Sequence, residues 1–120
     1  MKLYTGYFDA LEKYVKAGLN PISVAGWAPQ DYKGQEWKFF APYFTTYTKY
    51  KSGEYTEQQY TKEYIAKIEA LDKTELKAKI DKIENSIFLC YEKEGFCHRH
   101  LLAEWLKETF GYQIEEFKLK

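Results

Sequence analysis

The sequence lacks both an excess of charge and any long apolar run. Its 18 basic and 18 acidic residues give a formal net charge of +0, and no block of like charge stands out. Proteins that bind DNA, RNA or anionic lipid through their overall field carry a positive excess. No segment approaches the length that spans a bilayer, and the first residues lack the apolar run of a signal peptide. We therefore expect no nucleic-acid partner and no membrane partner.

Cysteine is scarce, with two residues in the chain. Without an export signal, this usage predicts reduced thiols and a cytoplasmic location. Aromatic residues, in contrast, make up 19% of the chain and include twelve tyrosines. Tyrosines can line a partly wet cleft as well as a dry core, although codon bias is the simpler explanation of the surplus. At 120 residues, the chain fits one domain over residues 1–120.

The first third of the chain reads as strand, helix, strand. Leu3 to Thr5 form a short opening strand, and Asp9 to Glu12 form a capping box for a helix that ends at Gly18. Residues 21–25 form the second strand, and this order favours a parallel sheet. The aromatic residues of 28–41 follow no clean period, which predicts a long ordered loop over the edge of the sheet.

The rest of the chain predicts four helices and two further strands. The helices run from Pro42 to about Lys51, from capping boxes at Thr56–Gln59 and Asp72–Glu75, and from Cys97 to about Phe110. Residues 87–91 are an unbroken apolar run, typical of a strand buried on both faces, and 112–117 alternate like an edge strand. The order predicts a three-layer α/β sandwich with a small, mostly parallel sheet.

The functional site is expected at the carboxyl ends of the parallel strands, where helices present their N-termini. Three segments of the sequence end there. The residues expected to bind a ligand are Thr5, Gly6, Tyr7, Trp27, Tyr32, Cys90, Glu92 and Arg99.

Helix periodicity assigns directions at the start of the last helix. His98 shares a face with Leu101, Leu102 and Trp105 and should point towards the sheet, whereas His100 should meet solvent. Cys97 stands at the N-cap, where the helix dipole lowers a thiol pKa, so Cys97 is a candidate nucleophile with His98 as its base. Plain structural roles for Cys97, His98 and Cys90 are the alternative.

Arg99 is the strongest local indication of an anion site. The helix dipole disfavours a cation in the first turn, so Arg99 is expected to bind an anion or a carboxylate. Glu92 could be an internal partner, which would make the pair structural. If Arg99 binds a ligand, Arg99→Ala removes binding and leaves the fold intact.

A metal site is the competing interpretation, because cysteine, histidine and glutamate residues gather between Cys90 and His100. Structural zinc sites usually pair ligands two to four residues apart, and His98 and His100 point to opposite helix faces. We therefore expect no metal and no cofactor. A Cys90–Cys97 disulfide is also disfavoured, because the expected compartment is reducing.

Several segments resemble the signature of the domain of unknown function 488 family. They are Lys2 to Phe8, Phe40 to Pro42, Tyr50 to Gly53, Glu63-Tyr64, Leu89 to Lys93 and Cys97 to Ala103. The paired Cys-x-Glu and Cys-His-Arg motifs are the most specific part. The resemblance implies a compact α/β fold with these residues in one pocket, and it implies no function.

Three functional hypotheses follow. The first is binding of a small anionic, nucleotide-like ligand around Cys90 to Arg99, to sense or sequester a signalling nucleotide. The second is a thiol-dependent enzyme that acts on a nucleotide-like or phosphate-bearing substrate, with Cys97 as nucleophile. The third is a protein-partner module that uses the aromatic loop 28–41. The sequence favours the first.

Overall fold

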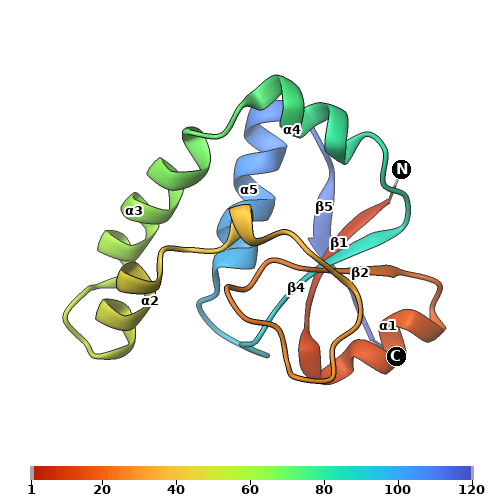
Figure 1. Cartoon of the computed structure of the whole chain (residues 1–120), viewed down its shortest axis with the longest axis horizontal. Coiled ribbons are helices and arrows are strands. Elements are labelled where there is room, and N and C mark those ends of the chain that lie inside the picture. Colours follow the sequence, from red (N-terminus) through yellow and green to blue (C-terminus); the bar gives the residue numbers. More distant parts are fainter. Residues whose placement is uncertain (1, 120) are drawn as a thin grey trace.

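The computed structural model describes residues 2–119, which are built around a sheet of five parallel strands in the order β3-β2-β4-β1-β5. The strands are β1 (Leu3–Tyr7), β2 (Asn20–Ser23), β3 (Gln35–Glu36), β4 (Ser86–Cys90) and β5 (Ile114–Glu116). Tyr7 pairs with Cys90, and Ser23 pairs with Leu89. The carboxyl ends of β1, β2 and β4 therefore meet at one edge of the sheet (Figure 1).

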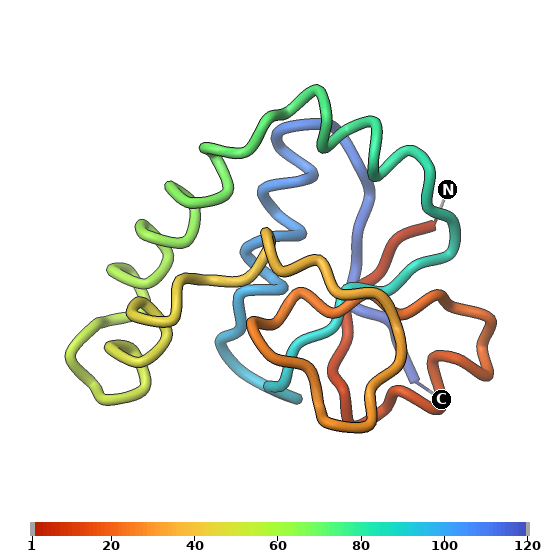
Figure 2. The backbone as a smooth tube through the Cα atoms, in the orientation of Figure 1, coloured from red at the N-terminus to blue at the C-terminus, as the bar shows by residue number. Residues whose placement is uncertain are grey.

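Helices lie on both sides of this sheet (Figure 1 and Figure 2). They are α1 (Leu11–Lys16), α2 (Phe44–Lys51), α3 (Glu57–Glu69), α4 (Lys73–Ile80) and α5 (His98–Phe110). Phe88 of β4 belongs to a core shared with α3, α4 and α5, whereas Ile87 and Leu89 belong to a second core under α1. This alternation explains why Ile87 to Cys90 are all buried. Tyr91, the last residue of the predicted strand, lies beyond β4 and is exposed. The predicted three-layer sandwich is confirmed, and within the described residues its strand pairs are all parallel.

Two of the three expected capping sites are confirmed. The Thr56 hydroxyl accepts from Gln59 N–H at 3.2 Å while the Gln59 side chain accepts from Thr56 N–H, and Asp72 caps α4 by accepting from Glu75 N–H. The capping box at Asp9 is wrong. Strand β1 continues to Tyr7 and passes directly into a 3₁₀ turn, Phe8–Ala10, so α1 begins at Leu11 with Ala10 as its N-cap.

Residues 28–41 are more structured than the sequence indicated. They contain β3, which pairs with β2, and a 3₁₀ turn over Lys38–Phe40. A strand of two residues is too short to show alternation, so β3 leaves no sign in the sequence. Trp37 and Phe40 are buried in the larger core, so two of the loop's aromatic rings hold the loop on the sheet. Strand β2 also ends at Ser23, two residues earlier than expected.

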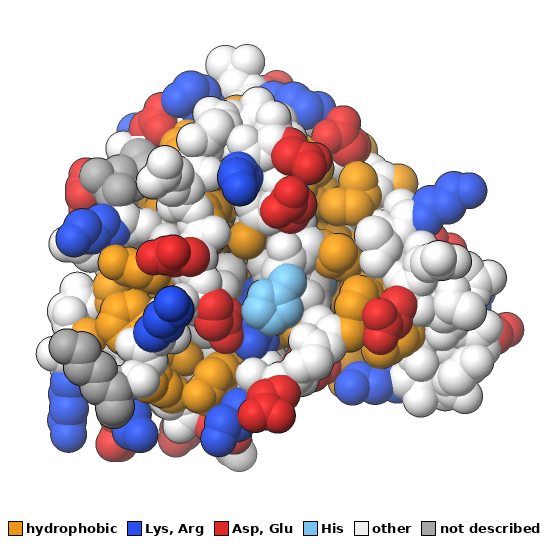
Figure 3. Space-filling view, turned by 180° about the vertical axis from the view of Figure 1, so that it is seen from behind, with side chains coloured by type: hydrophobic (Ala, Val, Ile, Leu, Met, Phe, Trp, Pro, Cys, Tyr) orange, Lys and Arg blue, Asp and Glu red, His pale blue; other side chains and the backbone are white. Residues whose placement is uncertain are grey.

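The surface carries charges of both signs. On the face shown in Figure 3, lysine and arginine side chains are interspersed with aspartate and glutamate side chains, among uncharged and hydrophobic areas. Within residues 2–119, no helix has the length and apolar character needed to cross a membrane.

Candidate functional site

A cavity of about 360 Å³ lies at the carboxyl edge of the sheet. Its walls come from the loop after β2, from α2 and α3, and from the segment that joins β4 to α5. Rings that line it include Trp27, Phe44, Tyr47, Tyr50, Tyr60 and Phe96. Its charged lining residues are Lys38, Lys51, Lys67 and Glu92, which leaves an excess of positive charge.

Five of the expected site residues line this cavity: Trp27, Cys90, Glu92, Cys97 and His98. The others lie outside it. The Tyr32 hydroxyl donates to the carbonyl of Gln35 at 2.7 Å, and the Tyr7 ring lies over the Arg99 guanidinium at 5.8 Å. The cavity is therefore lined by predicted residues at the carboxyl ends of β2 and β4, and by none of those predicted at the end of β1.

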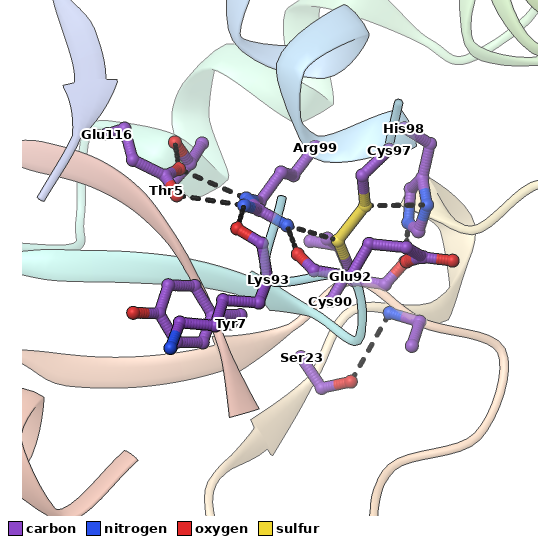
Figure 4. The surroundings of a disulfide bond; sticks show 12 residues. Thr5, Tyr7, Ser23, Cys90, Glu92, Lys93, Cys97, His98, Arg99 and Glu116 are labelled. Atoms are coloured by element: carbon purple, nitrogen blue, oxygen red, sulfur yellow. Dashed lines mark hydrogen bonds and ion pairs between the residues drawn. A yellow bond between two sulfur atoms is a disulfide. The ribbon is translucent and has the colours of Figure 1, made fainter. Parts of the chain in front are cut away.

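Cys90 and Cys97 are joined by a disulfide (Figure 4). Cys90 is the last residue of β4, Cys97 is the N-cap of α5, and their exposed fractions are 1% and 4%. The expectation of two separate thiols is therefore wrong in this structure. The connection turns back through Gly95, whose φ of +83° suits glycine, and this turn brings the strand end to the helix start.

His98 points inward, as helix periodicity predicted, and it is 7% exposed. Its Nε2 lies 2.7 Å from the carbonyl oxygen of Val24, and its Nδ1 lies 3.9 Å from Cys97 Sγ. The carbonyl can only accept, so Nε2 carries the proton and Nδ1 presents a lone pair to the sulfur. Burial lowers the pKa of His98 to about 4, which leaves the ring neutral near pH 7.

Arg99 is enclosed by protein groups, with an exposed fraction of 1%. Its Nε and Nη2 donate to the two carboxylate oxygens of Glu116 at 3.0 and 2.8 Å, and Nη1 donates to Cys90 Sγ at 3.0 Å. The backbone carbonyls of Glu92 and Lys93 accept further bonds. The carboxylate that Arg99 binds is thus Glu116 on β5, and the Glu92 carboxylate instead pairs with Lys51 at 3.3 Å.

The sequence pointed to the Arg99 cation but not to its partner, Glu116. A carboxylate partner was anticipated, and residues 112–117 were recognised as an edge strand. The missing information was strand order: β5 pairs with β1, which places Glu116 opposite Thr5 and within reach of α5. The Thr5 hydroxyl donates to the same carboxylate at 2.6 Å, so Thr5 supports the ion pair.

Glu116→Gln is expected to make the free energy of unfolding less sensitive to a fall in pH. Burial raises the pKa of Glu116, but hydrogen bonds from Arg99 and Thr5 outweigh it and hold the pKa below its usual 4.5. A lowered folded-state pKa gives stability that is present above pH 4.5 and is lost as pH falls through the folded value. Urea unfolding from about pH 7 to about pH 3 should show this loss in the wild type and a smaller one in the variant. An equal loss of stability in the wild type and in Glu116→Gln would contradict this prediction.

Gly6→Ala is expected to destabilise the fold, because β1 passes close to the core under α1. A Cβ at Gly6 would lie 2.6 Å from the Tyr14 hydroxyl and 2.7 Å from Ile87 Cδ1, and both side chains are fully buried. Overpacking of this kind costs about 1 to 3 kcal/mol. Thermal unfolding measures it, with Gly26→Ala as the control because a Cβ there meets no atom within 4 Å. Equal melting temperatures for the two variants would argue against this packing.

The aromatic residues of α2 and α3 that line the cavity were not among the site residues expected from the sequence. Tyr47, Tyr50 and Tyr60 line the cavity, yet their spacing looked like that of ordinary amphipathic helices. Lys67 was missed as well. Its ammonium donates to the carbonyls of Ala41 and Phe39 at 2.5 and 3.3 Å, and burial lowers its pKa.

A family model described as the active DUF488-N3 subclade matches residues 13–110. No match to the chain is found among curated proteins or among solved structures. The matched range includes the cavity walls and both cysteine motifs. On that match, and on the Cys-x-Glu and Cys-His-Arg motifs that meet at the disulfide, the chain belongs to the DUF488 family.

Proposed function

We propose that the protein binds a small, planar, anionic ligand of nucleotide-like chemistry in the cavity beside Cys90 and Cys97. The observation that carries the proposal is the cavity itself, about 360 Å³ in volume and walled by aromatic rings with lysines among them. Concave, largely apolar sites with a few polar groups are typical of small-molecule binding. The position beyond the carboxyl ends of parallel strands is the usual one for ligands of open α/β sheets.

The aromatic wall supports a planar ligand. Trp27 and Phe44 are both exposed and pack edge to face, with ring centroids 5.2 Å apart. Deeper in the site, Phe96 lies against Tyr50 and Tyr60 at 5.2 and 5.1 Å. Rings of this kind can stack on any heterocyclic base, because every base has a flat aromatic face.

The lysines support a negative charge on the ligand. Lys38, Lys51 and Lys67 line the cavity, with Glu92 as the opposing charge. Cys97 and His98, at the N-terminus of α5, line it too, and within residues 2–119 no side chain caps that helix end. Free amides and the helix dipole favour an anion. Arg99 is not part of this proposal, because Glu116 already occupies its guanidinium.

Binding without turnover suits a protein that senses or sequesters a signalling nucleotide. We propose the cytoplasm as its compartment, where the Cys90–Cys97 bond would be open to reduction. Mass spectrometry of molecules released when the purified protein is denatured tests the proposal most directly. A thermal-shift series of nucleoside mono-, di- and triphosphates gives an independent measurement, since a bound ligand raises stability by mass action.

Lys51 offers a matched pair of variants for that series. Lys51→Ala removes a lysine that lines the cavity, while Lys62→Ala removes an exposed lysine on α3 that does not. A nucleotide-like anion should lose affinity in the first variant only. Equal shifts for both variants, together with no released molecule, would refute the proposal.

Trp27→Ala is expected to weaken ligand binding about fivefold, the low end of the stacking energies of bases on aromatic rings. The low end applies because Trp27 is 63% exposed and stands at the open side of the cavity. The other two tryptophans, Trp37 and Trp105, are buried. Ligand quenching of tryptophan fluorescence should therefore come mainly from Trp27 and disappear in the variant. Unchanged quenching would place the ligand elsewhere.

A thiol-dependent enzyme is the second candidate, favoured by the fact that Cys90, Cys97 and His98 line the same cavity. The description of the matching family as active agrees with this candidate. Once reduced, Cys97 at the N-cap of α5 would be the nucleophile towards a nucleotide-like or phosphate-bearing substrate. Conversion of a bound ligand that is lost in Cys97→Ser would favour it over simple binding. The partner-binding hypothesis loses support, because Trp37 and Phe40 face the core.

A further inference from the structure

Three metal-ligand atoms converge at the junction of β4 and α5. The sulfurs of Cys90 and Cys97 and a ring nitrogen of His98 lie within 4.8 Å of one another, and all three residues are buried. We propose that in the reduced protein Cys90, Cys97 and His98 bind a zinc ion, with the fourth coordination position open to the cavity. This site does not depend on the proposed nucleotide-like ligand.

His98 is already arranged as a ligand. Its Nε2–H donates to the Val24 carbonyl, so the Nδ1 lone pair is the one that faces the sulfurs. Histidines that bind metals usually make this kind of hydrogen bond with their other nitrogen. The Nδ1 to Cys97 Sγ distance is 3.9 Å, close to the roughly 3.6 Å that tetrahedral zinc bonds to sulfur and nitrogen would give. His100, whose opposite direction argued against zinc in the sequence, is not needed.

The backbone has room for two separate thiolates. The Cα atoms of Cys90 and Cys97 are 7.4 Å apart, beyond the roughly 4.4 to 6.8 Å usual for disulfides. Two sulfurs that share a zinc ion lie about 3.8 Å apart, given the zinc–sulfur bond length. The strand end and the helix start can therefore stay in place when the sulfurs separate.

The surrounding charges suit a thiolate site. Arg99 Nη1 donates to Cys90 Sγ at 3.0 Å, and the guanidinium is neutralised by Glu116. Two thiolates and one Zn²⁺ also sum to zero, so the buried group carries no net charge. Thiolate and imidazole together are ligands that zinc prefers over harder cations such as Mg²⁺.

The open fourth coordination position determines what the proposed zinc site can do chemically. All three ligands line the cavity, so a water molecule or a donor atom of a bound molecule can complete the tetrahedron from that side. Zinc sites with three protein ligands and one open position polarise or activate what binds there, whereas closed four-ligand sites are structural.

Loading requires reduction of the disulfide. Two equivalents of a small thiol reduce the bond: the two protein sulfurs gain two electrons and two protons, and the small thiols become one disulfide. Zinc then displaces the two thiol protons. The oxidised and the metal-bound forms are therefore alternative states of the same pair of sulfurs.

The test is a cobalt and zinc titration of the 120-residue protein, reduced with a phosphine under nitrogen. We expect one equivalent of Co²⁺ to give the visible bands of a tetrahedral site and a sulfur-to-cobalt charge-transfer band, and Zn²⁺ to abolish both. The oxidised protein should give neither. His98→Ala should weaken the affinity at least about tenfold, while His100→Ala, the matched control on the exposed face, should leave it unchanged.

Alkylation of the wild type provides a readout that does not depend on a variant folding. One equivalent of Zn²⁺ should protect both cysteines of the reduced protein from iodoacetamide, as counted by intact mass. Unprotected cysteines, or a cobalt spectrum without the charge-transfer band, in protein with a normal circular dichroism spectrum would overturn the proposal. Equal affinities of the two histidine variants would exclude His98 as the third ligand.

Discussion

Glu116→Ala is expected to lower the free energy of unfolding by about 3 kcal/mol, measured by urea denaturation near neutral pH. The variant leaves the Arg99 guanidinium, 1% exposed, without the carboxylate that accepts two of its hydrogen bonds. Removal of one member of a buried ion pair typically costs about 3 to 5 kcal/mol, and the low end applies because the Glu116 side chain is itself 35% exposed.

Two further variants separate this effect from general damage to β5. Glu115→Ala changes the exposed neighbour on the same strand and should cost less than about 0.5 kcal/mol. Replacement of both partners, Arg99→Met with Glu116→Leu, should recover much of the loss, since no charge is then left buried. A double variant less stable than Glu116→Ala would show that Arg99 stabilises the fold mainly through Cys90 and the carbonyls of Glu92 and Lys93.

This ion pair also changes how Arg99 variants must be interpreted. From the sequence alone, Arg99→Ala is expected to abolish ligand binding in an intact fold. The guanidinium instead links β4, α5 and β5 through Cys90 and Glu116, so the variant should lose stability whether or not a ligand binds. Lys51 and Trp27, which line the cavity and are exposed, are the better probes of binding.

The sequence predicted the features that depend on local periodicity. The apolar run around Phe88, the inward direction of His98 and the extent of α5 to Phe110 all follow from side-chain spacing, and each is confirmed. The pairing of Glu116 with Arg99 depends on strand order, which no local pattern encodes. The cavity depends on how the α2 and α3 rings meet the β4–α5 junction, and amphipathic spacing is the same with or without a cavity.

The Cys90–Cys97 disulfide is another feature that depends on the tertiary fold and not on a local sequence pattern. Its absence was inferred from the expected compartment and not from geometry. The register of β4 and the turn at Gly95 decide whether Cys90 reaches Cys97, and neither is visible in the spacing of two cysteines. The position of Cys97 at the N-cap of α5 was predicted, and its bond to Cys90 was not.

Reduction of the Cys90–Cys97 disulfide is expected to lower the free energy of unfolding by about 2.5 kcal/mol. The two cysteines are seven residues apart, and the chain entropy removed from the unfolded state by a loop of that length has about this value. Urea unfolding with and without a phosphine reductant measures the effect. A Cys90→Ser, Cys97→Ser double variant is the control, because its stability should not respond to the reductant. A wild type equally indifferent to the reductant would show that the sulfurs are not bonded in solution.

Zinc should then reverse much of that loss. A ligand that binds the folded state alone adds about 2.7 kcal/mol when its free concentration is 100 times its Kd. Reduced wild type with zinc should therefore unfold at nearly the urea concentration of the oxidised protein, while reduced His98→Ala should recover less at the same zinc concentration. Recovery of this size would mean that the disulfide and the metal stabilise the β4–α5 junction equally well, so that a change of redox state alters the chemistry at the cavity wall while the fold remains stable.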